Sequence, residues 1–365
     1  MSKLFRRLYC HSRSSIFRHN IHYFCTKKSE ELNREKLLEN SFDYCVSEFK
    51  REEPQIFNCV QKLRAKPSVI LGVNVLRCLH LELSRIRTEA KTADAAQIRL
   101  NWWKSIMQEL INEDVNREIE SKKGKIITDD PRYHGFYDKK SDKNKGTPKY
   151  ENTTPVLRCL KIIKRKYNIN NEFLMRLVTA REPFLTSNTF MSLFELEEYS
   201  ENTQTILLYM TMECMGIAYN DKYKDNEHFR CASHIGAFMT IVSVIKSIPL
   251  AAVNGFIGIP DDINNDYRLF EHENNILSGN STIALEKAIE YMSERAYEHL
   301  NAAHDISKSL DKYVNSVMLV SLSAQRYLNR LEKCKFNVFD QELIQPDMGI
   351  SFGYDLLYKR FKGTF

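Results

Sequence analysis

The sequence predicts an all-α protein, and three observations support this fold class. Apolar residues recur at helical spacing through most of the 365 residues. Only 12 Gly and 9 Pro are present, which is few for the many tight turns of an all-β protein. No stretch shows a convincing strand pattern of alternating apolar and polar residues. With 43% hydrophobic residues, the chain is long enough to bury one large core or two smaller ones.

The helical periodicity predicts a series of helices along the chain. The first carries Leu38, Phe42 and Phe49 on one stripe. Pro54 and Pro67 bracket a short second helix, because proline is tolerated at the start of a helix but breaks its interior. The full predicted series is 30–52, the short helix between the two prolines, 68–90, 93–112, 155–166, 171–182, 192–217, 228–248, 281–309, 311–334 and 354–361.

One stretch, about 113–154, interrupts this periodicity. It is dense in Lys, Asp and Gly and has almost no aliphatic residues at helical spacing. Such a composition cannot bury enough apolar surface to offset the entropy lost on ordering. We therefore expect a mobile insertion within a single domain that spans 29–365.

The N-terminal segment 1–28 has the composition of a mitochondrial transit peptide. It contains seven Lys or Arg residues, several Ser and no acidic residue, and the first acid of the chain is Glu30. Apolar residues such as Leu4, Phe5 and Phe17 separate the cations, as in a basic amphipathic helix. A secretory signal would need an unbroken apolar run of roughly 7–15 residues, and none is present.

Net charge and cysteine spacing exclude two further classes of protein. The formal net charge of +6 includes the seven cations of residues 1–28, so the remainder carries −1. No basic nucleic-acid-binding surface is implied, and we expect no nucleic-acid partner. The nine cysteines are scattered without a CxxC pair, which indicates free thiols in a reducing compartment.

The tightest metal-like spacing is His228, Cys231 and His234. Positions three apart share one face of a helix, but the third residue, six positions on, is rotated well away. Three ligands would not converge, so we interpret these side chains as ordinary helix residues.

The apolar run 235–245 raises the possibility of a membrane span. Its eleven residues cover roughly 16 Å of a hydrocarbon core about 30 Å thick. Lys246 follows at once, and Pro249, Gly255 and Pro260 are expected to end the helix. The sequence therefore favours a buried central helix.

Five stretches outside the insertion have the most distinctive sequences: VLRCLHLELSRIRTEA (75–90), IRLNWWKSIMQEL (98–110), ELEEYSENTQTILLYM (195–210), ASHIGAFMTIVSVIKSIP (232–249) and IGIPDD (257–262). In this order they resemble the squalene/phytoene synthase family, the head-to-head prenyl transferases. The first and fourth lie where the family has its two aspartate-rich helices. The second resembles its arginine/tryptophan helix, the third its EL–Y–VA helix, and the last its YLP-x-D turn.

The resemblance covers about Phe42 to Phe361 and implies an all-α, isoprenoid-synthase-like helical bundle around a central cavity. Within the family, ELEEYSENTQTILLY followed by ASHIG is similar to a mitochondrial branch whose members assist the assembly of respiratory complex I. That likeness implies an early assembly role at the matrix face of the inner membrane, with peripheral membrane association. It also implies complex I subunits or other assembly factors as partners.

The family's chemistry depends on carboxylates that the resemblance does not find here. In the enzymes, aspartates four residues apart on facing helices hold Mg²⁺ ions against a diphosphate leaving group. The resemblance places the first pair at Ser84 and Thr88. On the second helix the corresponding positions are Thr240, Ser243, Lys246 and Ser247. We therefore expect vestigial metal positions at Ser84, Thr88, Ser243 and Ser247, no metal, no cofactor and no catalytic residue.

Two acidic patterns offer other interpretations. Glu82 and Glu89 share a helix face, as an acid/base pair might, but Arg85 lies between them and favours a surface ion-pair cluster. DDINND (261–266) resembles an aspartate box, but it follows Pro260 in a turn-rich stretch. We predict a loop there, without a shared helical face.

The interior leaves one question of function open. Met210, Met212, Phe238 and Met239 lie on helices that line the prenyl tunnel in the related enzymes. Core packing is the simpler interpretation, since Met fills irregular gaps, but a vestigial lipid pocket is the alternative. The sequence thus predicts a non-catalytic assembly factor. The rival hypotheses are a prenyl-diphosphate or lipid-modifying transferase with altered metal ligands, and a lipid carrier.

Overall fold

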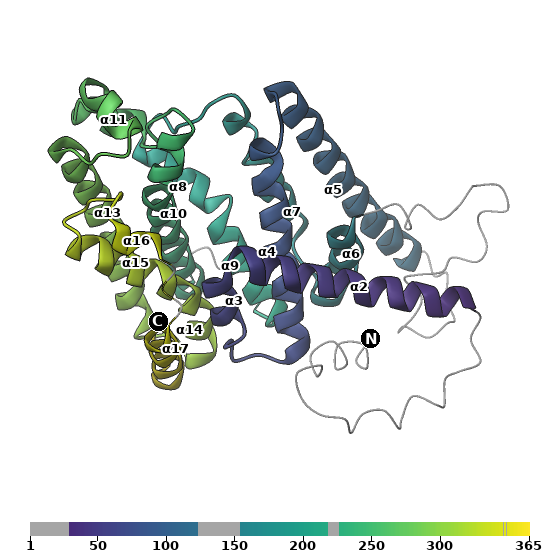
Figure 1. The fold of residues 1–365 in the computed structure, drawn as a ribbon. Helices are drawn as coiled ribbons and strands as arrows, with labels where there is room; N and C mark the ends of the chain where they lie inside the picture. Colours follow the sequence, from purple (N-terminus) through teal and green to yellow (C-terminus); the bar gives the residue numbers. More distant parts are fainter. Residues whose placement is uncertain (1–28, 123–153, 218–225, 346, 348) are drawn as a thin grey trace.

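The computed structural model describes residues 29–122, 154–217, 226–345, 347 and 349–365, and Figure 1 shows their arrangement. Within these ranges every regular element is a helix and none is a strand. The predicted all-α class is therefore confirmed. Residues 1–28 and most of the predicted insertion lie outside the described residues.

The N-terminal half is a layer of helices crossed by α2. Figure 1 shows α2 lying across α4 and α6, and its buried face includes Phe42, Cys45 and Phe49. Prolines begin α3, α4 and α6, where a missing backbone N–H has no cost. The bounds are α2 Ser29–Glu52, α3 Pro54–Val60, α4 Pro67–Thr88, α5 Ala93–Lys122, α6 Pro155–Tyr167, α7 Asn171–Thr179 and the 3₁₀ turn η3 Pro183–Leu185.

The predicted helix 93–112 is longer than expected. Helix α5 continues to Lys122, so residues 113–122 are helical. Glu113 accepts from Lys161 and Arg165 of α6, each at 3.2 Å, and these ion pairs tie the extended helix to its neighbour. Composition alone missed this contact because it depends on a helix more than forty residues away in the sequence.

The predicted helix 192–217 is two helices, α8 (Leu193–Glu201) and α9 (Gln204–Cys214). Polar side chains at the junction bond back to the preceding turn. Asn202 Nδ2 donates to the Glu198 carbonyl at 3.0 Å, and Thr203 Oγ1 donates to the Tyr199 carbonyl at 2.7 Å. Such side-chain bonds compete with the helical ladder, which explains the break.

Helix α10 (Glu227–Val253) is the central element and packs against α8, α9, α13 (Ile283–Ser307) and α15 (Leu322–Lys333). It approaches α9 closely at Gly236. A Cβ placed there would lie 1.9 Å from Thr205 Oγ1 and 2.9 Å from Thr205 Cα. Only glycine allows the two helices to come this close.

The prediction that Pro249 ends this helix was wrong, because α10 continues through Pro249 to Val253. By length and composition the 27-residue helix would suffice to cross a membrane. However, most of its apolar side chains, from Phe229 to Ile248, are buried in the core. The predicted buried central helix is confirmed.

The remaining elements pack around α10 and at the C-terminal end of the molecule. The predicted helix 311–334 is interrupted by a 3₁₀ turn, and the C-terminal helix α17 is longer than predicted. The bounds are α11 Asp261–Asp266, η5 Leu269–His272, α12 Glu273–Leu277, α14 Lys312–Met318, η6 Leu319–Ser321, α16 Gln341–Ile344 and α17 Ile350–Lys362. In Figure 1, α17 lies at the lower edge of the molecule, below α14.

Candidate functional site

The four predicted metal positions are exposed hydroxyls on α4 and α10. Three of them donate to a carbonyl of their own helix: Ser84 to Leu81 at 2.8 Å, Thr88 to Arg85 at 3.4 Å and Ser247 to Val244 at 2.8 Å. Helix α9 packs against both α4 and α10. The structure thus places the four side chains on two helices without bringing any of them into a shared hydrogen bond.

This donor set does not fit Mg²⁺. A magnesium site draws on anionic carboxylates, whereas a serine or threonine hydroxyl is neutral. Among the described residues, no three His, Cys, Asp or Glu side chains gather closely enough to hold a metal ion.

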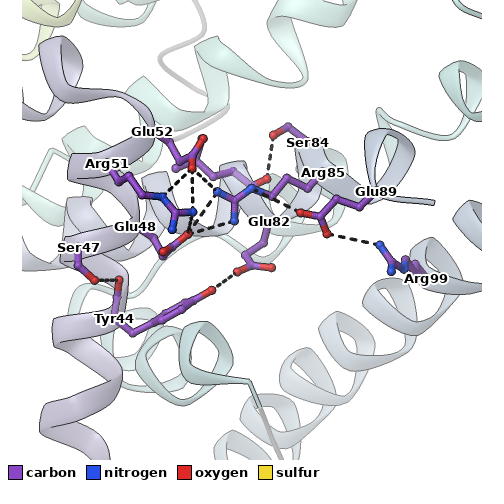
Figure 2. Close-up of polar contacts among 11 residues, drawn as sticks. Tyr44, Ser47, Glu48, Arg51, Glu52, Glu82, Ser84, Arg85, Glu89 and Arg99 are labelled. Atoms are coloured by element: carbon purple, nitrogen blue, oxygen red, sulfur yellow. Dashed lines mark hydrogen bonds and ion pairs between the residues drawn. The ribbon is translucent and has the colours of Figure 1, made fainter. Parts of the chain in front are cut away.

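Beside Ser84 the structure has an ion-pair cluster that joins α2, α4 and α5 (Figure 2). The Arg85 guanidinium lies 3.2 Å from Glu48, 3.0 Å from Glu52 and 3.9 Å from Glu89. Burial disfavours the charged form of Arg85, but the carboxylates of Glu48 and Glu52 outweigh it and raise its pKa. The predicted ion-pair cluster is confirmed for Arg85 and Glu89.

Glu82 has a different partner from the one predicted. It accepts a 2.8 Å hydrogen bond from the Tyr44 hydroxyl of α2, as Figure 2 shows. Burial and this carboxylate together raise the pKa of Tyr44 above its usual value, so the phenol stays protonated. Glu82 and Glu89 therefore belong to separate contacts and do not form an acid/base pair.

The DDINND segment was predicted as a loop, but its six residues form the short helix α11. Asp262 Oδ2 accepts from the backbone N–H of Leu193 at 3.0 Å, and Asp261 Oδ1 accepts from Thr189 Oγ1 at 3.1 Å. The loop assignment failed because Pro260 suits the start of a helix as well as a turn. The two aspartates attach α11 to the segment that precedes and begins α8.

His228, Cys231 and His234 are on α10 and do not converge. Cys231 Sγ donates to the Ala303 carbonyl of α13 at 3.5 Å, whereas His234 Nδ1 lies 3.0 Å from His299 Nδ1. Their interpretation as ordinary helix residues is confirmed. The four candidate tunnel residues Met210, Met212, Phe238 and Met239 are all part of the buried core.

Sequence reasoning missed a buried polar chain that connects α4, α9 and the residues after α7. Arg77 Nη1 donates to Gln204 Oε1 at 3.0 Å, and Gln204 Nε2 lies 3.3 Å from His80 Nε2. Arg181 Nη2 donates to His80 Nδ1 at 3.0 Å. Burial, reinforced by the two arginines, lowers the pKa of His80 well below its usual value. This hydrogen-bonded set of side chains therefore contains two guanidinium cations and a neutral imidazole.

A second missed cluster joins α8, α10 and α13. Arg295 donates to both carboxylate oxygens of Glu197, at 2.7 and 3.2 Å, and His299 Nε2 lies 3.2 Å from Glu197. Burial alone would raise the pKa of Glu197, but His299 and Arg295 outweigh it and lower the pKa to about 2. The acids of ELEEYSE at 195–201 were the only available signal, and the partners of Glu197 are about a hundred residues away.

The seven described cysteines are free, as predicted, and six of them are buried. Cys45 of α2 lies next to Cys78 of α4 and Cys159 of α6, close enough for contacts between their side chains. The contact with Cys159 and burial raise the pKa of Cys45, although the contact with Cys78 opposes them. The contact with Cys45 and burial raise the pKa of Cys78, so both residues remain thiols. Cys10 and Cys25 lie outside the described residues.

The helical architecture and the order of its motifs define a class of protein. A family model described as squalene/phytoene synthase matches residues 65–348, and the chain belongs to this family. The fold is similar to that of a dehydrosqualene synthase solved in complex with ligand, with a TM-score of 0.64 at 12% identity over 90% of this chain and 97% of that one. Squalene synthase HpnC from Alicyclobacillus acidocaldarius gives a TM-score of 0.58 at 12% identity, over 82% and 96%.

The sequence is similar to a particular branch of the family. NADH dehydrogenase (ubiquinone) complex I, assembly factor 6, of Mus musculus is 22% identical over 84% of this chain and 78% of its own length. The assembly factor 6 homolog of Drosophila melanogaster is 32% identical over 54% of this chain and 57% of its own length. The expected branch of the family is confirmed.

Proposed function

We propose that this protein is a non-catalytic assembly factor for mitochondrial respiratory complex I (NADH dehydrogenase). It acts early, at the matrix face of the inner membrane, with complex I subunits or other assembly factors as partners. The names of its relatives support the assembly role. In this proposal the protein is a pseudoenzyme that keeps the prenyl transferase body without its catalytic aspartates.

One observation carries the non-catalytic part of the proposal. The four positions where the resemblance implies metal ligands hold Ser84, Thr88, Ser243 and Ser247, and three of their hydroxyls bond within their own helix. Neutral hydroxyls supply no charge to bind the magnesium of a diphosphate leaving group.

The assembly role is tested by rescue in cells that lack their own copy of the protein. The full chain should restore complex I activity and the amount of the assembled complex. A matched variant with Val242→Asp, which buries a charge in α10, should restore neither. If complex I assembles normally in the cells without any added protein, the proposed role is wrong.

The proposed location depends on residues 1–28. We propose that this acid-free basic segment directs the chain into mitochondria and that residues 29–365 form the working domain. Residues 1–28 fused to a fluorescent reporter should carry it into mitochondria. The same segment with its seven cations changed to Gln is the control and should leave the reporter in the cytosol, while a cytosolic wild-type fusion would refute the targeting role.

The rival hypothesis, binding of a prenyl diphosphate, is favoured by one feature. Arg77 and Arg181 are buried, and the Nε atom of each has no hydrogen-bond partner among the described residues. Calorimetric titration of the purified chain with Mg²⁺ and farnesyl diphosphate separates the two functions. The assembly-factor proposal expects no saturable heat, whereas binding that Arg77→Gln abolishes would establish a working pocket.

A further inference from the structure

Helix α17 has apolar residues on two opposite faces, and the core uses only one of them. Phe352 and Leu356 are buried against the body of the protein. At 100° per residue they lie on the far side of the helix from Ile350 and Phe361. Since the core is already covered by the inner face, the second apolar face has no packing role within the described residues.

The outer face is a continuous stripe of large exposed side chains. Its five members lie within an arc of about 100° on the helix, and they are Ile350, Tyr354, Leu357, Tyr358 and Phe361. Ile350 is 94% exposed and Phe361 is 76% exposed. The rings of Tyr354 and Tyr358 stack, with centroids 6.3 Å apart. Scattered exposed apolar residues are normal, but a contiguous stripe on one helix indicates an interaction surface.

The helix that presents this stripe is firmly attached. Arg326 of α15 pairs with Asp355 and donates to Ser351 Oγ at 2.7 Å. Near the other end, Asn315 Nδ2 donates to the Gly363 carbonyl at 3.1 Å, and the Phe365 ring is buried. The apolar stripe is therefore held in place on the surface.

Cations flank the stripe on both sides. Lys362 lies at one edge, with its Nζ 5.7 Å from the centre of the Tyr358 ring. At the other edge Arg360 donates to the Lys62 carbonyl at 2.8 Å and borders a shallow depression. The depression is lined by Leu63, Arg64, Ala65, Lys66, Tyr313 and Arg360.

No described carboxylate neutralises the cations of this region. Arg64, Lys66 and Arg360 have no carboxylate within the 4.0 Å ion-pair distance among the described residues, and neither has Lys362. Arg64 donates instead to the Arg360 carbonyl, and its Nε has no hydrogen-bond partner there. The one acid on α17, Asp355, is paired with Arg326.

We propose that this face of α17, together with the neighbouring cations, docks on an anionic phospholipid bilayer. Leucine and phenylalanine would enter the acyl boundary, tyrosine rings suit the headgroup level, and the cations would meet lipid phosphates. This inference deepens the proposed location at the matrix face of the inner membrane. It rests on the proposed function only in naming that membrane as the bilayer. The assembly role does not depend on it.

Shape and charge favour a bilayer over a protein partner. The stripe is one convex face of a 13-residue helix, about 20 Å long. Its flanking cations complement lipid phosphates, since the one acid of the helix, Asp355, is already paired with Arg326. An interfacial helix binds through a narrow apolar stripe with flanking cations of this kind.

The test is flotation of the full chain with vesicles of phosphatidylcholine alone or with about 30% phosphatidylglycerol. The wild-type chain should float with the anionic vesicles, and Leu357→Ser with Phe361→Ser should weaken binding at least about tenfold. Phe194→Ser with Leu250→Ser is the matched control, because these two side chains are about as exposed but lie on α8 and α10. It should bind like the wild type.

A second variant separates charge from folding. Lys66→Gln with Lys362→Gln should lower binding to anionic vesicles several-fold without changing the melting temperature. Failure of the wild-type chain to float overturns the proposal, and so does unchanged binding of the serine variant. If the serine variant floats normally but no longer co-purifies complex I subunits, the face docks a protein and the proposal is wrong. Rescue of complex I activity is measured separately, so a failed flotation leaves the assembly role standing.

Discussion

Two stretches of helix α10 differ in what they require of their residues. In the first stretch, Gly236 faces Thr205 of α9 at a distance that leaves no room for a methyl group. About two and three turns further along the same face, Ser243 and Ser247 are exposed, and Ser247 bonds only to its own helix. The shape of the bundle therefore depends on the packed stretch, while the charges of a metal site would have to come from the exposed one. A chain can lose the second property and keep the first.

The largest effect should come from a charge at a buried position of α10. Val242 is 2% exposed, and Val242→Asp would bury a carboxylate without a partner. The cost of about 4 kcal/mol or more is comparable with the whole stability of a typical domain. We expect loss of helical circular dichroism and of soluble protein. Ser243→Asp, at the next position, which is exposed, is the control and should fold normally. An equal loss there would erase the difference between buried and exposed positions.

Adding a single methyl group at the closest contact should have the next largest effect. Gly236→Ala places a Cβ against both the side chain and the Cα of Thr205, so α9 and α10 must move apart. We expect a loss of about 2–4 kcal/mol in urea unfolding. Gly353→Ala, on α17 with nothing within 4 Å of its Cβ, should be neutral or stabilising by about 0.5–1 kcal/mol. A similar loss for Gly353→Ala would show that the contact with Thr205 does not control the result.

Two carboxylates extend the comparison to the pH dependence of stability. Burial raises the pKa of Glu213 on α9 to about 7, from 4.5 for an exposed glutamate. The folded state thus holds this proton more tightly than the unfolded chain, and stability falls as the pH rises from 4.5 to about 7. Glu213→Gln should therefore stabilise the protein by about 1–3 kcal/mol at pH 8 and by little at pH 4.5.

Glu197 should behave in the opposite way. Its pKa is lowered to about 2 because His299 and Arg295 outweigh burial, so its contribution is present above pH 4.5 and is lost as the pH falls towards 2. Glu197→Gln should destabilise the protein at pH 7. Urea unfolding across this pH range measures both variants, and parallel pH profiles would contradict the opposite shifts.

The smallest effect should come from removing the four exposed hydroxyls on α4 and α10. Ser84→Ala, Thr88→Ala, Ser243→Ala and Ser247→Ala together remove no charge and no contact with another helix, at a cost of roughly 1 kcal/mol or less for each hydrogen bond. Rescue of complex I activity in cells should be almost intact. A well-folded quadruple variant that fails to rescue would reverse the comparison and assign a function to these exposed hydroxyls.

Helical periodicity predicted most helices, because the apolar stripe that it detects is the one that packs in the core. It failed where a local polar bond or a distant partner decides the geometry. Asn202 and Thr203 divide a helix by bonding to the backbone, and α10 continues through Pro249 within the packed bundle. Neither event changes the apolar pattern.

The polar clusters were harder to predict than the helices. Arg77, His80, Arg181 and Gln204 come from segments up to 127 residues apart, and each alone looks like an ordinary helix or loop residue. The ion pair of Arg85 with Glu89 was predictable because both residues are on one helix at a spacing of four. Its additional partners on α2 required the fold.

The buried cysteines can serve as built-in probes of local unfolding. Burial raises the pKa of Cys59 and of Cys231 to about 12, so neither is reactive while the helices stay packed. Cys334, which is only partly buried, is available as an internal reference. The rate at which iodoacetamide labels the buried thiols thus reports how often the bundle opens, residue by residue, without any added dye or tag.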